Sequence, residues 1–456
     1  MCWNAAYALL LFCSTIITYL CGITIDYIKQ SGRKSLKIRK ACVIICCALN
    51  FGILFFFKYF NFVIDNIQKV FAFINIELKI TQFDILLPVG ISFYTFQAVG
   101  YTIDVYRGET YAEKNFFRYA LFVSFFPQLV AGPIERSKNL LKQLAIPVKW
   151  CFENFRDGLL LMIWGFFLKL VISDRAAIFV NAVYGDYGSY PGWYLIVGTL
   201  LFGIQIYCDF SGYSVIAMGA ARMLGISLMV NFNAPYLSQS SAEFWRRWHI
   251  SLSSWFKDYL YIPLGGNRKG RLRKYINLMI TFIVSGLWHG AKWSYVAWGG
   301  INGLYQIIGD MLKPIKEKGA RLLFINPDSI GTKVLKIFTT FMLINFSWIF
   351  FRANRLKSAL SIIRSIFTVH NPWILFDGSL YTCGLTQKTF SMLIHAIGIL
   401  LMADILKHKN ITVRNVIVKQ DYWCQILVIV LGITGILYFG VYGPGFDAAN
   451  FIYFQF

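Results

Sequence analysis

Two histidines, His249 and His289, are the residues of this sequence best suited to carry out chemistry. His249 lies in the stretch EFWRRWHISLSS, and His289 ends an apolar run in the stretch SGLWHG. A polar side chain at the end of such a run is costly to place in lipid, so it usually has a function. A neutral imidazole titrates close to physiological pH and can take a proton from a hydroxyl group. We therefore predict that one histidine acts as a base while the other orients the reacting group.

The other histidines, the serines and the cysteines do not suggest a different catalytic group. His370 and His408 are expected in loops, and His395 is expected to pack within an apolar helix. The sequence contains no GxSxG motif for a serine nucleophile, and no cysteine forms an evident activated pair. Direct attack by an acceptor hydroxyl on an acyl donor is therefore favoured, and a transient acyl-enzyme remains open.

The stretch that carries His249 is expected to form one helix in the membrane interface. On a helical wheel, residues 245–259 separate into an aromatic face and a basic face. This pattern is typical of a helix that lies flat at the level of the lipid headgroups. His249 would lie at the edge of the aromatic face, where packing or a hydrogen bond to a carbonyl is the alternative to a catalytic role.

Basic residues close to both histidines are candidates for binding an anionic donor. One guanidinium group can donate two parallel hydrogen bonds to the oxygens of a phosphate, and an ammonium group attracts phosphate as a point charge. The alternative is that these residues only determine which loops face the cytoplasm. The predicted donor-binding residues are Arg246, Arg247, Arg268, Arg271, Arg273 and Lys274.

Five further residues are predicted to support or line the site. Trp248 and Trp288 adjoin the two histidines and would exclude water from a reactive donor. Asn302 lies in an apolar segment and needs a partner inside a helix bundle. Asp209 is a candidate buried carboxylate, and either Asp209 or Ser211 is alternatively the cap of a following helix.

The composition identifies the chain as a helical membrane protein. Of 456 residues, 57% are hydrophobic and only 14% are charged, and apolar runs of membrane-spanning length recur throughout. The net charge of +22 is concentrated in loops beside these runs, as expected for cytoplasmic loops. A nucleic-acid-binding protein would instead carry its charge on a soluble domain. The ten cysteines lie mostly in apolar runs and show neither a disulfide framework nor metal-ligand spacing.

Eleven or twelve membrane segments are expected, in a single domain over residues 1–456 with a catalytic core at about 86–310. Residues 3–25 are expected to form a first membrane helix and not a removable signal peptide, with the N-terminus outside. Residues 86–106 contain proline and glycine and are expected to form an inward-facing helix, broken or re-entrant, while Pro127, Gly132 and Pro133 indicate a break in the segment 116–134. An ordinary kinked helix is the alternative for both. Residues 313–336 are expected as a cytoplasmic loop, and the C-terminal FIYFQF is expected to pack against the bundle.

Several motifs in order along the chain resemble one protein family. These include LPVGISFYTFQAVGYTIDVYRG, FFPQLVAGPIERS, EFWRRWHISLSSWFKDYLYIPLGGNRKG, SGLWHGAKWSYVAWGGINGL and NFSWIFFRA. They resemble the membrane-bound O-acyltransferase (MBOAT) family, and most closely its branch that acetylates alginate, peptidoglycan and other exopolysaccharides. The resemblance covers nearly the whole chain and keeps the order and spacing of the motifs.

The resemblance implies a fold, a site and a reaction. The fold would be a ring of tilted helices around a central tunnel, with His289 at the catalytic position and His249 at the second motif position. The donor would be a cytoplasmic thioester such as acetyl-CoA, with no bound cofactor or metal. The acetyl group would pass outward to a cell-envelope polysaccharide, through an extracytoplasmic partner acetyltransferase of the SGNH type. The protein would lie in the bacterial cytoplasmic membrane.

Other functions remain open at this stage. The D-alanyl transferase of teichoic acid is a related enzyme that takes its acyl group from a carrier-protein thioester. A transporter of an acyl carrier would also need broken helices and a polar path, but would not cleave the thioester. A scaffold of an export complex would tolerate the loss of both histidines.

Overall fold

The protein is helical throughout the part of the chain that the structure describes. The computed structural model describes residues 6–31, 35–78, 80–83 and 87–443, and within these ranges it contains helices and loops but no β-strand. The helical fold expected from the sequence is thus confirmed. The C-terminal FIYFQF lies outside the described residues.

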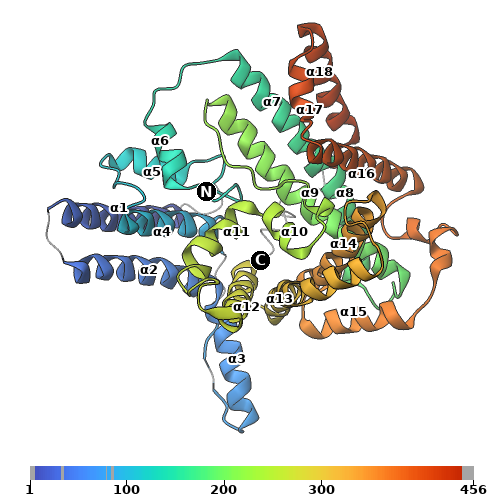
Figure 1. Cartoon of the computed structure of the whole chain (residues 1–456), viewed down its shortest axis with the longest axis horizontal. Helices are drawn as coiled ribbons and strands as arrows, with labels where there is room; N and C mark the ends of the chain where they lie inside the picture. The colour runs from blue at the N-terminus through green and yellow to red at the C-terminus, as the bar shows by residue number, and fades with distance from the viewer. Residues whose placement is uncertain (1–5, 32–34, 79, 84–86, 444–456) are drawn as a thin grey trace. The chain divides into compact units, whose positions relative to one another are not determined.

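The chain divides into two compact units (Figure 1). The first unit comprises Met1–Asn154 and Ala221–Met229. Its helices are α1 (Ala6–Gln30), α2 (Leu36–Lys58), α3 (Phe60–Phe73), α4 (Ile91–Arg107), α5 (Phe116–Ser124) and α6 (Ser137–Leu144). Within this unit α4 packs against both α1 and α2, and almost all of its residues are buried. The inward-facing helix expected at 86–106 is confirmed, and it is unbroken from Ile91 onward.

The segment at 116–134 is broken. Helix α5 ends at Ser124, and the chain then runs through turns that include Pro127 before α6 begins. Proline cannot donate a backbone hydrogen bond and clashes with the preceding turn of a helix. The prolines and glycines of FFPQLVAGP therefore end the helix as the sequence predicts.

The second unit comprises Phe155–Ala220 and Val230–Phe456 and contains both histidines. It begins in α7 (Phe152–Phe166), the π-helix η1 (Phe167–Ser173), α8 (Asp174–Gly185) and α9 (Trp193–Met223). Its middle part holds η2 (Pro235–Leu237), α10 (Ser241–Arg247), α11 (Ile250–Phe256), η3 (Lys257–Tyr261), α12 (Gly270–His289), α13 (Trp293–Leu322) and α14 (Ile330–Arg352). It ends in α15 (Leu356–Thr368), η4 (Pro372–Leu375), η5 (Ser379–Thr382), α16 (Gln387–His408), α17 (Val413–Val418) and α18 (Tyr422–Phe439).

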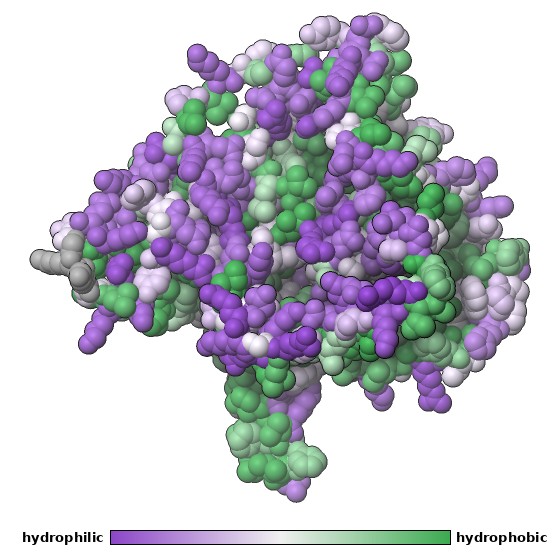
Figure 2. All heavy atoms as spheres, in the orientation of Figure 1, coloured by the Kyte–Doolittle hydropathy of each residue, from purple (hydrophilic) through white to green (hydrophobic). Residues whose placement is uncertain are grey.

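Six helices of the described residues are long and apolar enough to cross a membrane: Tyr7–Gln30, Leu36–Lys58, Trp193–Met223, Ile330–Arg352, Gln387–His408 and Tyr422–Phe439. Several other expected segments are helices that are shorter or more polar, such as α4, α7 and α12, and they fall outside this group. Exposed apolar side chains cover parts of the surface, for example Val70 and Phe73 on α3, which is largely hydrophobic in Figure 2. Such surfaces are stable in lipid and unstable in water.

Two helices differ from their expected lengths. Helix α13 continues through Pro314 to Leu322, so much of the basic loop expected at 313–336 is helical.

Helix α9 runs without interruption from Trp193 to Met223, so neither Asp209 nor Ser211 caps a new helix. Asp209 is instead buried mid-helix, where its carboxylate lies 2.6 Å from the Lys169 ammonium. No cap is needed there, because the amides that follow Asp209 are bonded within the continuous helix, and the ion pair instead compensates the buried charge of the carboxylate.

Helices α12 and α13 form a tightly packed hairpin. A β-carbon added at Gly286 would collide with the backbone carbonyl of Tyr295, and one added at Gly299 would collide with that of Phe282. Only glycine permits the backbones to approach this closely, as in other membrane helix pairs. The hairpin matters for function because His289 is the last residue of α12.

Replacing Gly299 by alanine is expected to destabilise this hairpin by about 1–3 kcal/mol, the usual cost of overpacking. The neighbouring Gly300 is a matched control, since a β-carbon there meets no atom within 4 Å. Alanine at position 300 is expected to be neutral or stabilising by up to about 1 kcal/mol, because alanine favours helix more than glycine does. Thermal unfolding of the two variants in detergent measures the difference. Equal stability of the two variants would contradict this packing.

Candidate active site

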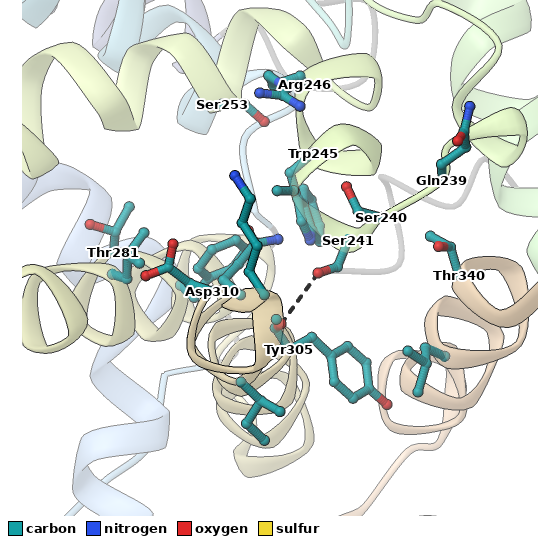
Figure 3. A pocket seen from close by; sticks show the side chains of 18 of the residues that line it. Gln239, Ser240, Ser241, Trp245, Arg246, Ser253, Thr281, Tyr305, Asp310 and Thr340 are labelled. Carbon is teal, nitrogen blue, oxygen red and sulfur yellow. Dashed lines mark hydrogen bonds between the residues drawn. The ribbon is translucent and has the colours of Figure 1, made fainter. Parts of the chain in front are cut away.

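A large cavity in the second unit connects basic side chains with the two histidines. Its volume is about 1500 Å³, and it is lined by residues of α10, α11, α12, α13 and α14. Figure 3 shows residues from all these helices around the same space: Trp245, Arg246, Ser253, Thr281, Tyr305, Asp310 and Thr340. Within the cavity Ser241 donates a hydrogen bond to the Tyr305 carbonyl. This volume exceeds that of an ordinary small-molecule pocket, so it can hold a long substrate.

One face of α12 forms a continuous wall of this cavity. The α12 residues that line it are Lys274, Leu278, Thr281, Phe282, Ser285 and His289. They are spaced three or four residues apart or lie next to one another, so they share one side of the helix. His289 follows Lys274 by fifteen positions, which corresponds to about 22 Å along the helix. The cavity therefore extends from the basic start of α12 to the imidazole at its end.

The chemical character of the lining changes along the cavity. Four of its five lysines, Lys274, Lys313, Lys316 and Lys336, lie at the end near the start of α12, together with the carboxylates of Asp310 and Glu317. The middle contains apolar side chains such as Leu278, Phe282 and Leu343. The imidazoles of His249 and His289 lie toward the far end of the α12 wall. An anionic head, an apolar arm and a reactive carbonyl would meet these three regions in that order.

The two histidines lie side by side in a nearly dry environment. Their ring centroids are 6.4 Å apart, and His249 and His289 are 1% and 5% exposed. Trp288 packs against both rings, and Trp298 and Phe351 pack against His289. Burial lowers the pKa of His249 well below its ordinary value, and the neighbouring His289 acts in the same direction. His249 is therefore neutral at physiological pH.

The single interfacial helix expected at 245–259 is wrong. Helix α10 ends at Arg247, Trp248 is extended, and His249 adopts a left-handed backbone conformation with φ of +44° before α11 begins. The cause is a pairing with a distant segment: the Asn231 carbonyl accepts from the Ile250 amide, and the Asn233 amide donates to the Arg247 carbonyl. These bonds replace helical ones and place the His249 imidazole in the cavity wall.

The five predicted supporting residues have different environments. Trp288 is confirmed as a neighbour of both imidazoles. Trp248 packs in an aromatic core with Phe244 and Trp348 and does not line the cavity. Asp209 is bound to Lys169 and Ser211 is buried on the same helix, while Asn302 donates to the Trp298 carbonyl within α13. These last three are buried within their helices and are not among the residues that line the cavity.

Only some of the predicted donor-binding residues line the cavity. Arg246 and Lys274 line the cavity, and Lys274 forms an ion pair of 2.7 Å with Asp310. Arg247 is held by Glu243 at 2.6 Å and also donates to His408. Arg268, Arg271 and Arg273 are exposed and do not line the cavity. Lys313, Lys316 and Lys336 line it instead, and they were missed because sequence reasoning assigned them to a loop that only determines topology.

Asn231 was also not predicted from the sequence to be part of the site. Its side-chain oxygen lies 3.2 Å from the Nδ1 atom of His249. The two residues are 18 positions apart and belong to different structural segments, so no local motif links them. Asn231 lies in the short stretch VNFNAPY, where it is one of two asparagines among apolar residues, and nothing there distinguishes it as part of a site.

Comparison with known proteins identifies the family of this chain. Residues 109–351 match the model of the membrane-bound O-acyltransferase family. The chain is 37% identical over 370 residues to the Pseudomonas aeruginosa protein named "Probable alginate O-acetylase AlgI", covering 80% of this chain and 67% of that protein. It is 32% identical over 391 residues to the peptidoglycan O-acetyltransferase of Helicobacter pylori, covering 80% and 71% of the two chains.

A more distant relative is the teichoic acid D-alanyltransferase of Streptococcus thermophilus, which is 30% identical over 284 residues. That match covers 58% of this chain and 68% of the relative. The chain belongs to the membrane-bound O-acyltransferase family and is a membrane-bound acyltransferase. The resemblance of its motifs to this family is therefore confirmed.

Proposed function

We propose that this protein transfers an acetyl group from a cytoplasmic thioester, acetyl-CoA, to a hydroxyl group on the outer side of the membrane. One observation carries the proposal: a single cavity is lined by lysines at one end and by His249 and His289 toward the other. A thioester of coenzyme A has phosphates, a long arm and a reactive carbonyl in the corresponding order. The relatives named as alginate O-acetylase and peptidoglycan O-acetyltransferase support acetyl as the acyl group.

The lysine-lined end is the proposed entrance for the donor. Lys274 lies near the start of α12, Lys313 and Lys316 lie in the second half of α13, and Lys336 lies near the start of α14. Since consecutive helices of the hairpin run in opposite directions, these positions share one end of the bundle. Clustered lysines also favour the cytoplasmic side of a membrane. The donor phosphates would bind these ammonium groups together with Arg246.

The imidazole end is the proposed place of reaction. His289 takes the proton from the acceptor hydroxyl as its oxygen attacks the thioester carbonyl carbon. The carbon–sulfur bond then breaks, and the thiolate leaves and takes up a proton to give the free thiol. His249 orients the hydroxyl or the thioester. Trp288, Trp298 and Phe351 around His289 keep water from hydrolysing the donor.

The acceptor is proposed to be a cell-envelope polysaccharide, acetylated through an extracytoplasmic partner of the SGNH type. The protein would then work in the bacterial cytoplasmic membrane, where its donor and its acceptor lie on opposite sides. The names of the alginate and peptidoglycan relatives support a polysaccharide acceptor. The match to a teichoic acid D-alanyltransferase favours, as a second candidate, a carrier-protein thioester of D-alanine as donor.

A donor assay with the purified protein tests the proposal. The protein in detergent or vesicles is supplied with radiolabelled acetyl-CoA or with a D-alanyl carrier protein, and release of free thiol is measured in the presence of a hydroxyl acceptor. Thiol release from acetyl-CoA that is coupled to acetylation of the acceptor is expected. Release from the carrier protein alone would establish the second candidate. Movement of the intact thioester across the membrane without thiol release would overturn an enzymatic role and indicate a transporter.

A further inference from the structure

We propose that Asn231 is a positioning residue that fixes the tautomer and orientation of His249. The proposal rests on the proposed role of His249 in acyl transfer. Asn231 is 1% exposed, and its side-chain oxygen Oδ1 is surrounded by three groups. These are Nδ1 of His249 at 3.2 Å, the backbone nitrogen of Ser251 at 3.2 Å and the Ser251 hydroxyl at 3.0 Å.

The neighbours of Asn231 determine which way its amide points. The backbone nitrogen of Ser251 can only donate a hydrogen bond, so the side-chain atom facing it must be the Asn231 oxygen and not the nitrogen. The other side of the amide agrees, because Nδ2 donates to the hydroxyl of Ser214 on α9 at 3.2 Å. The orientation of this amide is therefore set by the network and does not depend on a choice between equivalent flips.

The orientation of the amide in turn determines the protonation of His249. A carbonyl oxygen can only accept, so Nδ1 of His249 must carry the hydrogen that it donates to Asn231. In the neutral imidazole Nε2 then has the lone pair and can accept a hydrogen bond or a proton. Burial keeps His249 neutral, so this is the form present at physiological pH. The Nε2 atom is then the acceptor through which His249 can orient a substrate hydroxyl.

The backbone of Asn231 adds a second constraint on the same histidine. Its carbonyl accepts from the Ile250 amide, while its side-chain oxygen accepts from the Ser251 amide. One residue thus binds the first two amides of α11 and holds His249 in its left-handed conformation. A non-glycine residue in this conformation is costly and persists where surrounding bonds enforce it. Asn231 therefore positions both the ring and the backbone of His249.

Two variants of Asn231 separate a role in catalysis from a role in folding. Asn231→Leu has a similar size but removes the acceptor, and transfer is expected to fall by about 10- to 100-fold, as when a group that orients a metal-binding imidazole is removed. Asn231→Asp keeps an acceptor for both His249 and Ser251, so it should restore much of the activity. Ser214→Ala is the matched control, because it removes a partner of the Asn231 amide without touching His249, and near-normal transfer is expected.

The pH dependence of kcat/KM in the Asn231→Asp variant tests the positioning role most sharply. A carboxylate beside Nδ1 stabilises the imidazolium, so the pKa of His249 should rise by on the order of one unit or more. The acidic limb of the kcat/KM profile should then move to higher pH than in the wild type. The titratable neighbour that the structure places against this ring is His289 of α12, while Phe210 of α9 and Trp288 of α12 also pack on it and do not titrate. An unchanged profile with normal activity would overturn the positioning role.

A spectroscopic measurement tests the tautomer without relying on activity. The sequence has five histidines, so protein labelled with ¹⁵N-histidine gives a small set of imidazole signals, and His249→Gln identifies those of His249. A protonated Nδ1 and an unprotonated Nε2 are expected, and this pattern should weaken or invert in Asn231→Leu. The opposite tautomer in the wild type would refute the proposal even if the enzyme is active. Failure of the wild type to release thiol, with the expected tautomer present, would instead refute the proposed function.

Discussion

Replacing His289 by alanine is expected to lower acetyl transfer by about 10²- to 10⁴-fold, the usual contribution of a general base. The expectation follows from its position, since its imidazole lines the cavity at the end of the α12 wall and is almost completely buried. The protein should still insert and fold, because alanine is a good helix former and His289 is the last residue of α12. Thiol release and acceptor acetylation by purified protein measure the effect.

His395→Ala is the matched control for this experiment. This histidine lies on α16, one of the six helices that could cross a membrane, but it is exposed, and its Nδ1 atom bonds locally to the Ser391 carbonyl on the same helix. Its replacement should leave transfer unchanged. Near-normal transfer by the His289 variant would refute the role of His289 as base. Full activity of variants lacking both His249 and His289 would indicate a scaffold and not an enzyme.

Reversing the charge of two lysines at the cavity entrance is expected to weaken donor binding strongly. In the double variant Lys313→Glu and Lys316→Glu, the KM for acetyl-CoA should rise by about 10- to 100-fold. A hydrogen bond to a charged group contributes about 1.5–3 kcal/mol, and the exposure of Lys313 reduces this through solvent screening. The value of kcat should change little, because in the proposed binding mode the lysines contact the head of the donor and not the reacting carbonyl. Steady-state kinetics with acetyl-CoA separate the two parameters.

The double variant Arg271→Glu and Arg273→Glu is the control with the same change in charge. Both arginines lie in the first turn of α12 but do not line the cavity, so the KM should stay close to that of the wild type. This comparison also tests the donor-binding role predicted from the sequence for these arginines. A larger effect of the arginine pair than of the lysine pair would place the donor outside the cavity described here.

Local sequence patterns predicted much of the fold because membrane helices are determined largely by apolar run length. Helices α1 and α4 correspond to the helices expected at 3–25 and 86–106, and the break after α5 follows from its proline. Of the site, the structure brings together the two histidines that the sequence singled out, with Trp288 packed against both. Their immediate surroundings of tryptophan and basic residues distinguished them from the other three histidines.

Long-range contacts explain what the sequence did not predict. The break at His249 depends on hydrogen bonds to Asn231 and Asn233, which a helical wheel of residues 245–259 cannot include. For Asp209 the sequence left a buried carboxylate and a helix cap both open, because its partner Lys169 lies on another helix. The lysines of α13 and α14 looked like parts of a loop because their position at the cavity depends on how these helices pack. In each case a tertiary contact overrides a local pattern.

The central claim is tested most directly by a structure of the protein bound to a stable thioether analogue of acetyl-CoA. In this analogue a ketone carbonyl stands in place of the thioester carbonyl. The account predicts phosphate density at Lys313 and Lys316, the arm along the α12 wall past Ser285, and the carbonyl close to His289. The distance from the carbonyl carbon to the imidazole should leave room for one hydroxyl hydrogen-bonded to the ring at about 2.6–3.2 Å. An analogue bound elsewhere, with this cavity empty and both histidines remote from its carbonyl, would contradict the account.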